Sequence, residues 1–161
     1  MSYTLMSHGR ALGRTGAELP APAAGMRSWH FIPAATFAEA QPLFAALPAA
    51  IEDSQEAIPT QGELAAIPEA ERQARMRELL LADPRMARFI ELSEQLEALD
   101  LALVDASGDR LATSAIGVTE LDIPAEAFSA VLASVDPSLS PAATSPPFYL
   151  LVAELPVNRE P

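Results

Sequence analysis

The chain has 161 residues, a formal net charge of −12 and no cysteine. A chain of this length fits one domain with its own core, and the lack of cysteine excludes disulfide frameworks, zinc ribbons, iron–sulfur ligation and cysteine nucleophiles. The acidic balance argues against a nucleic-acid partner, because phosphate binding needs a basic face, and favours a basic protein surface.

The chain opens with the pattern of a β-hairpin. Residues 3–7 alternate in a strand-like way, His8-Gly9 reads as a turn, and a second strand follows over 10–19. Glycine at this turn can take a positive φ, as tight hairpins require. A further short strand is expected over 29–32, ended by Pro33.

This opening can be written Tyr3-x-Leu-x-Ser-x-Gly-Arg-x-Leu-Gly-x-Thr15, followed by Trp29-x-Phe-x-Pro33. It resembles the start of small uncharacterised bacterial proteins. The likeness covers only this first part of the chain. It implies no activity, and no functional residue can be carried over from it.

Two capping boxes mark expected helix starts. The first, Thr36 to Glu39, opens a region in which Pro42 and Pro48 predict two short helices instead of one long one. The second, Thr60 to Glu63, precedes a helix with Pro68 in its first turn that runs to about Ala82.

The clearest boundary in the chain is Asp83-Pro84. Asp accepts amide hydrogen bonds as an N-cap, and Pro suits the first helical position, so a helix is predicted to begin at Pro84. Its apolar residues form a broad stripe typical of a core-facing side: Met86, Phe89, Ile90, Leu92, Leu96 and Leu99.

A second hairpin is predicted over 101–121, with strands at 101–104 and 110–121 around an Asp105–Asp109 turn. A short helix follows from Pro124 through Ala133. Residues 136–147 hold four prolines and read as an extended linker. Residues 148–155 are a β-prone apolar run that should insert into the sheet, since it would otherwise invite edge pairing.

These elements predict an α+β fold. We expect a mainly antiparallel sheet, built from two hairpins and the C-terminal strand and packed against several short helices. One domain would cover 1–156, followed by a frayed tail at 157–161. Because most other apolar residues are Ala and Leu, the core should depend on the large aromatic residues: Trp29, Phe31, Phe37, Phe44, Phe89, Phe128 and Phe148.

Charge is segregated along the chain. Every charged residue between 31 and 71 is acidic, whereas the stretch after it is rich in arginine. Two helices with solvated, mutually compensating faces are the plainer explanation. The alternative is a patch that docks an anionic partner surface, and its candidate residues are Arg72, Arg75, Arg85 and Arg88.

No constellation of catalytic, metal-binding or cofactor-binding residues is evident. The two histidines, His8 and His30, have no ligand or nucleophile at a useful spacing, and strand alternation places His30 toward solvent. Asp105 and Asp109 lack the other ligands of a calcium loop. The glycines form neither a dinucleotide fingerprint nor a phosphate loop.

The sequence therefore predicts a non-catalytic protein–protein interaction protein, an accessory or structural subunit of a larger assembly. A peripheral subunit on a membrane-bound energy-transducing complex, such as a photosynthetic reaction centre, would fit. Two alternatives stay open. One is a small-ligand-binding or enzymatic domain with a pocket between sheet and helices. The other is an acidic regulatory or immunity-type protein that caps a basic partner.

A cytoplasmic location is expected. The start of the chain lacks the basic and apolar regions of a signal peptide. No stretch approaches the roughly 20 apolar residues that span a bilayer, so membrane contact would go through a protein partner.

Overall fold

A computed structural model of the chain describes residues 1–138 and 146–157. Contacts divide the chain into two compact units. The sheet unit comprises Met1–Gln41 and Leu99–Pro161, and the helical unit comprises Pro42–Ala98. That residues 1–156 fold as one domain stays a prediction. The predicted tail lies outside the described residues except for Val157, which is exposed.

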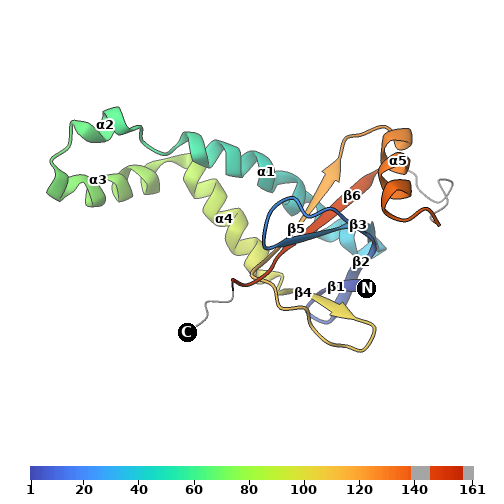
Figure 1. The fold of residues 1–161 in the computed structure, drawn as a ribbon. Coiled ribbons are helices and arrows are strands. Elements are labelled where there is room, and N and C mark those ends of the chain that lie inside the picture. Colours follow the sequence, from blue (N-terminus) through green and yellow to red (C-terminus); the bar gives the residue numbers. More distant parts are fainter. Residues whose placement is uncertain (139–145, 158–161) are drawn as a thin grey trace. The chain divides into compact units, whose positions relative to one another are not determined.

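The sheet unit is built on one antiparallel sheet with the strand order β4-β1-β2-β3-β6-β5 (Figure 1). Together with the helices, this confirms the predicted α+β class. The strands are β1 (Tyr3–Ser7), β2 (Arg10–Leu19), β3 (Met26–Pro33), β4 (Leu101–Asp105), β5 (Ala115–Leu121) and β6 (Phe148–Glu154).

The N-terminal hairpin is confirmed. Strand β1 pairs with β2 from Ser7↔Arg10 onward, and the two turn residues both have positive φ, 49° at His8 and 77° at Gly9. Two such residues define the tight turn whose twist matches that of the flanking strands. The positive φ of Gly9 was therefore predicted correctly from the sequence, and His8 adopts a positive φ as well.

The second predicted hairpin is wrong in its pairing. The Asp105 turn forms, since its carboxylate accepts the amide hydrogens of Ser107 at 2.8 Å and Asp109 at 3.0 Å. Beyond it, only the bridge Val104↔Arg110 joins the two arms, and β4 and β5 lie at opposite edges of the sheet. Residues 110–114 are mostly polar or small, and apolar alternation begins only at Ile116, so this stretch gains little by staying beside β4.

The C-terminal strand is confirmed as part of the fold. Strand β6 lies between β3 and β5 and pairs with both, with Leu151 opposite Trp29 on one side and Val118 on the other. Leu151 and Ala153 have no solvent exposure. Of the predicted linker 136–147, residues 139–145 lie outside the described part of the chain.

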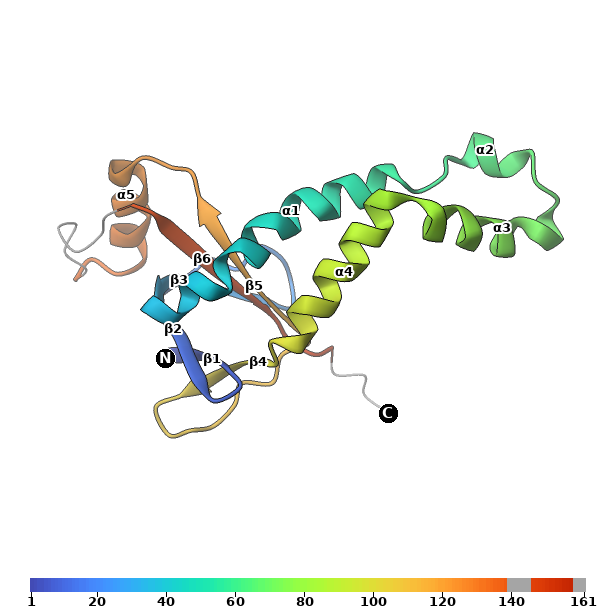
Figure 2. The same cartoon turned by 180° about the vertical axis from the view of Figure 1, so that it is seen from behind.

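Both faces of the sheet carry aromatic packing. His30 and Phe31 are neighbours in β3 and therefore point to opposite faces. Phe31 contacts Phe37 of the 3₁₀ helix η1 (Ala35–Glu39), with ring centroids 5.2 Å apart. His30 contacts Phe128 of α5 (Ala125–Val135) at 4.9 Å. Helices η1 and α5 thus cover opposite faces of the sheet. Figure 2 shows α5 beside the start of β6.

Two expectations about single aromatic residues are corrected. His30 does not face solvent, because α5 packs over it and leaves it half-buried. Phe89 is only partly buried, whereas the six other aromatic residues expected in the core are at most 4% exposed. Of the predicted stripe that follows Pro84, only Leu92 is buried.

The sequence predicted two short helices broken at Pro42 and Pro48. The structure instead has the short η1 followed by one longer helix, α1. Thr36 lies inside η1, and its hydroxyl donates to the carbonyl of Ala11 instead of capping a helix. Helix α1 (Gln41–Glu56) starts directly afterwards and continues through Pro48. Pro42 lies in the first turn of α1, where backbone amides make no hydrogen bond within the helix, so the lack of an amide hydrogen in proline costs nothing there.

The remaining helix boundaries follow the sequence. Thr60 and Glu63 form the predicted capping box of α2 (Gln61–Ala65), and α3 (Glu69–Ala82) follows Pro68. Helix α4 (Pro84–Ala98) begins where predicted, with the Asp83 carboxylate accepting the Arg85 amide hydrogen at 2.9 Å. The predicted helix after Pro124 is α5.

Candidate interaction surfaces

The four arginines expected to bind a partner all lie on the helical unit, but the structure does not assemble them into an unopposed patch. Arg72 has a local structural role, because its Nε donates to the carbonyls of Leu64 at 3.1 Å and Ile67 at 3.0 Å. These bonds tie the start of α3 to the end of α2 and to the link between the two helices.

The other three arginines are paired with carboxylates of the same unit. Arg75 pairs with Glu78 at 3.1 Å and Arg88 with Glu91 at 3.2 Å, each within one helical turn. Exposed pairs of this kind contribute about 0.2–1 kcal/mol or less. Arg85 bonds Asp83 at 2.9 Å, which lowers the pKa of that carboxyl, and lies 3.9 Å from Glu56.

Sequence reasoning missed Arg77. It lies in the middle of α3, and its side chain makes no hydrogen bond or ion pair with the described residues. It borders a shallow hollow of about 710 Å³ on that helix, together with Gln73 and Leu81. The i, i+4, i+8 spacing of these three residues is visible in the sequence. Only the structure shows that no carboxylate of the described residues forms an ion pair with Arg77.

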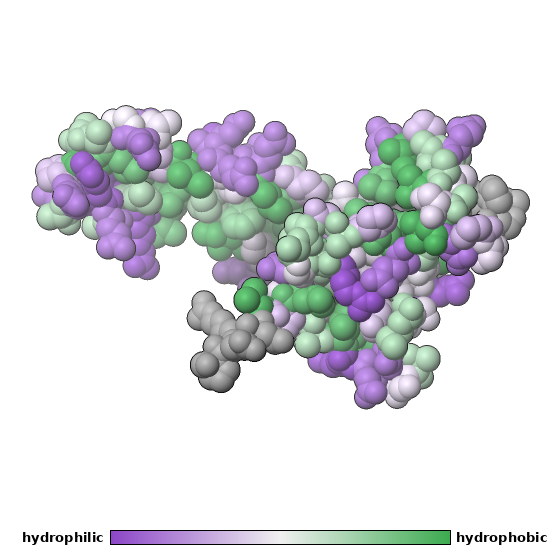
Figure 3. Space-filling model, in the orientation of Figure 1, coloured by the Kyte–Doolittle hydropathy of each residue, from purple (hydrophilic) through white to green (hydrophobic). Residues whose placement is uncertain are grey.

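Helices α2 and α3 bury no residue at all. Large apolar side chains on and beside them stay exposed: Ile58 by 52%, Leu79 by 39% and Leu81 by 62%. Figure 3 shows hydrophobic and hydrophilic groups intermixed over this region. In the whole helical unit the buried residues are Phe44, Ala50, Ser54 and Leu92.

A second candidate surface is a groove on the sheet unit. Strand β2 bulges against β3, since Thr15 pairs with Phe31 and Glu18 with Trp29, which leaves two residues of β2 opposite His30. Bulges bend a strand and re-aim its side chains, and they are common beside functional sites. Next to the bulge lies a hollow of about 790 Å³ whose lining includes Arg14 and His30.

Burial decides the protonation of His30. Packing against α5 lowers its pKa, because a desolvated imidazole resists taking up a charge. His30 is therefore a neutral wall of the groove near pH 7. Arg14, in contrast, is exposed, and its side chain makes no hydrogen bond or ion pair with the described residues.

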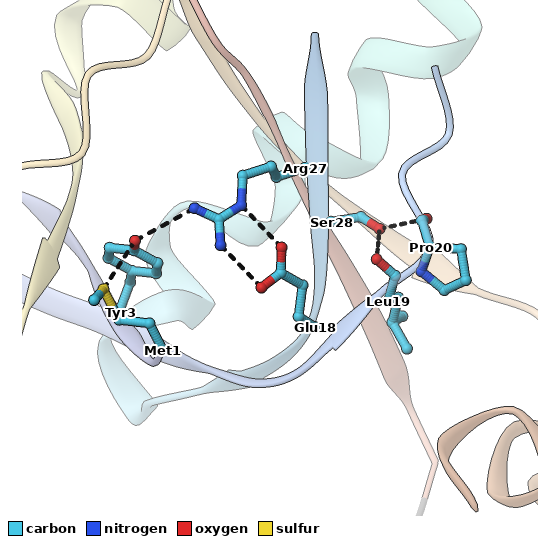
Figure 4. A network of polar contacts seen from close by, with 7 residues as sticks. All are labelled: Met1, Tyr3, Glu18, Leu19, Pro20, Arg27 and Ser28. Atoms are coloured by element: carbon cyan, nitrogen blue, oxygen red, sulfur yellow. Dashed lines mark hydrogen bonds and ion pairs between the residues drawn. The ribbon is translucent and has the colours of Figure 1, made fainter. Parts of the chain in front are cut away.

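The groove carboxylate of Glu18 is already neutralised (Figure 4). Arg27 donates to both of its oxygens at 2.9 Å, which lowers the pKa of Glu18. The same guanidinium donates to the Tyr3 hydroxyl at 3.4 Å and lies over the Trp29 ring at 4.8 Å. Glu18 is thus unavailable as a partner for Arg14.

No cluster of three potential metal ligands occurs among the described residues. Searches against protein-family models, curated proteins and solved structures found no match. Within residues 1–138 and 146–157, no helix has the length and apolar character needed to cross a membrane.

Proposed function

We propose that the chain is a non-catalytic protein–protein interaction protein, an accessory or structural subunit of a larger assembly, and that α2 and α3 contact the partner. The observation that carries this proposal is that neither helix buries a residue within the chain.

The physical argument concerns what keeps these helices ordered. An isolated helix shorter than about 12–15 residues is marginal in water, and helices in proteins gain most of their stability from packing an apolar side. Helix α3 has 14 residues and α2 has 5. The capping box and exposed ion pairs add only tenths of a kcal/mol to about one each. A partner surface would supply the missing burial.

The exposed side chains indicate the chemistry of that surface. Leu81 requires an apolar patch on the partner, and Arg77, one turn earlier on the same side of α3, requires a carboxylate at the border of that patch. Leu79 is exposed on a different side of the helix and would extend the apolar contact around it. Apolar centres with a charged rim are typical of protein interfaces. A membrane-bound energy-transducing complex, such as a photosynthetic reaction centre, is one assembly that would carry such a peripheral subunit.

The test is affinity purification of the tagged chain from its own cells. We expect a stoichiometric multi-subunit complex with the unmodified chain and its loss with Leu79→Glu plus Leu81→Glu. Val131→Glu is the matched control, because Val131 is 43% exposed but lies on α5.

Other outcomes favour the alternatives. Recovery of one basic protein would support an acidic regulatory protein that caps its partner. Recovery of the same complex with the double variant would refute the assignment of the contact to α3.

A further inference from the structure

We propose that the groove beside the β2 bulge binds a small organic anion, a carboxylate or phosphate monoester with an apolar body, and that Arg14 binds its anionic group. This proposal concerns the sheet unit and is independent of the proposed role of α2 and α3.

The shape of the groove comes from the bulge. Gly16 and Ala17 face His30 alone, so the strands lose their regular pairing at this point. A Cβ at Gly16 would lie only 3.2 Å from Nδ1 of His30, so glycine lets the two strands stay close there. The hollow of about 790 Å³ matches the range of small-molecule sites, roughly 300–1,000 Å³.

The charges of the groove favour an anion. The strand register places Arg14 opposite Ile32. Ile32 and His30 are two residues apart in β3, so the side chains of Arg14, Ile32 and His30 lie on the same face of the sheet. Its guanidinium makes no hydrogen bond or ion pair with the described residues. Of the groove's own carboxylates, Glu18 is neutralised by Arg27, and Asp136 stays ionised while it accepts the amide of Ser138 at 3.0 Å and its hydroxyl at 2.6 Å, so Arg14 is the charged side chain here without a partner among the described residues. The planar fork of arginine binds carboxylate and phosphate oxygens in pairs.

The remaining lining favours an apolar body. Ile32, Pro33 and Phe148 contribute to the walls, and the space far exceeds that of a bare inorganic ion. Most of a small ligand's contact surface in such sites is apolar, with a few polar groups that fix its orientation. Arg14 would fix the anionic end against these walls.

The probes are benzoate, phenyl phosphate, inorganic phosphate and neutral benzyl alcohol, titrated into the full chain and followed by heteronuclear NMR. Concentrations up to about 10 mM cover the millimolar Kd that fragment-sized ligands show. We expect at least one of the two aromatic anions to shift the amide resonances of residues 14–18 and 30–33. Benzyl alcohol and inorganic phosphate should bind at least about tenfold more weakly, a difference of about 1.4 kcal/mol.

Arg14→Gln should weaken binding of the aromatic anion about tenfold or more, because a bidentate charge-assisted contact is lost. Arg110→Gln is the matched control, since Arg110 is also exposed and its side chain makes no ion pair or hydrogen bond with the described residues, but it lies in the turn that follows β4. Three results would overturn the proposal. They are no binding of either aromatic anion, equal binding of inorganic phosphate, and equal losses in the Arg14 and Arg110 variants.

Discussion

Removal of the Phe128 ring tests how α5 is held on the sheet. Phe128 is 1% exposed. Its ring stacks on Phe148 with ring centroids 4.2 Å apart and forms a T-shaped contact with His30 with centroids 4.9 Å apart. Phe128→Ala deletes both contacts and leaves a cavity. Such truncations cost about 3–5 kcal/mol, of which each aromatic pair contributes about 0.5–1.5 kcal/mol.

The assay is urea and thermal unfolding followed by circular dichroism. For a chain of this size, each kcal/mol shifts Tm by about 2–4 °C, so a fall of about 6–20 °C is expected for the variant. Val131→Ala is the control, since it removes an apolar side chain from the exposed side of the same helix. Equal, small shifts for the two variants would refute the packing described for α5.

The same substitution should change how His30 titrates. Burial holds the pKa of His30 below its ordinary value of 6.5, so the folded state binds fewer protons than the unfolded state. The stability contributed by neutral His30 is complete above pH 6.5 and lost as pH falls through the lowered pKa. Phe128→Ala should let the pKa of His30 rise, which an NMR titration of the imidazole measures. An unchanged pKa would contradict burial by α5 as its cause.

Three further substitutions probe local features by urea unfolding and circular dichroism. Gly13→Ala would place a Cβ against Cζ of Phe31 and 2.6 Å from the carbonyl oxygen of Ile32, and should cost about 1–3 kcal/mol as overpacking; an unchanged midpoint would contradict these contacts. Thr15→Val should cost about 1–3 kcal/mol, since the buried amide of Tyr3 loses its 2.7 Å acceptor, whereas Thr15→Ser should retain most of the stability. Asp83→Ala should lower helicity more than Asp83→Asn does, because only the former removes the side-chain acceptor of α4.

The features that the sequence predicted correctly are set by neighbours in the chain. The His8-Gly9 turn and the Asp83-Pro84 boundary each depend on a few adjacent residues and their backbone preferences. The second hairpin failed for the opposite reason. Its turn at Asp105 is local and forms, but the partner of β5 is β6, which is encoded about thirty residues later.

The candidate surfaces were less readable. Glycine within a strand is a known signal of a bulge, so Gly16 gave a usable hint of the groove. Which arginine lacks an ion-pair partner depends on the direction in which each side chain leaves the helix and on the segments packed nearby. Arg75 pairs with Glu78, whereas Arg77 on the same helix pairs with no carboxylate of the described residues. Burial on α3 is likewise a property of tertiary packing, which composition cannot supply.

Hydrogen exchange measured by mass spectrometry tests the central claim, that α2 and α3 bury their apolar side chains against a partner. The free chain is compared with the complex isolated from its own cells. We predict fast exchange over 61–82 in the free chain, slow exchange over β3 and β6, and strong protection of 61–82 in the complex. Protection of 61–82 in the free chain equal to that of the central strands, or no gain in the complex, would contradict it.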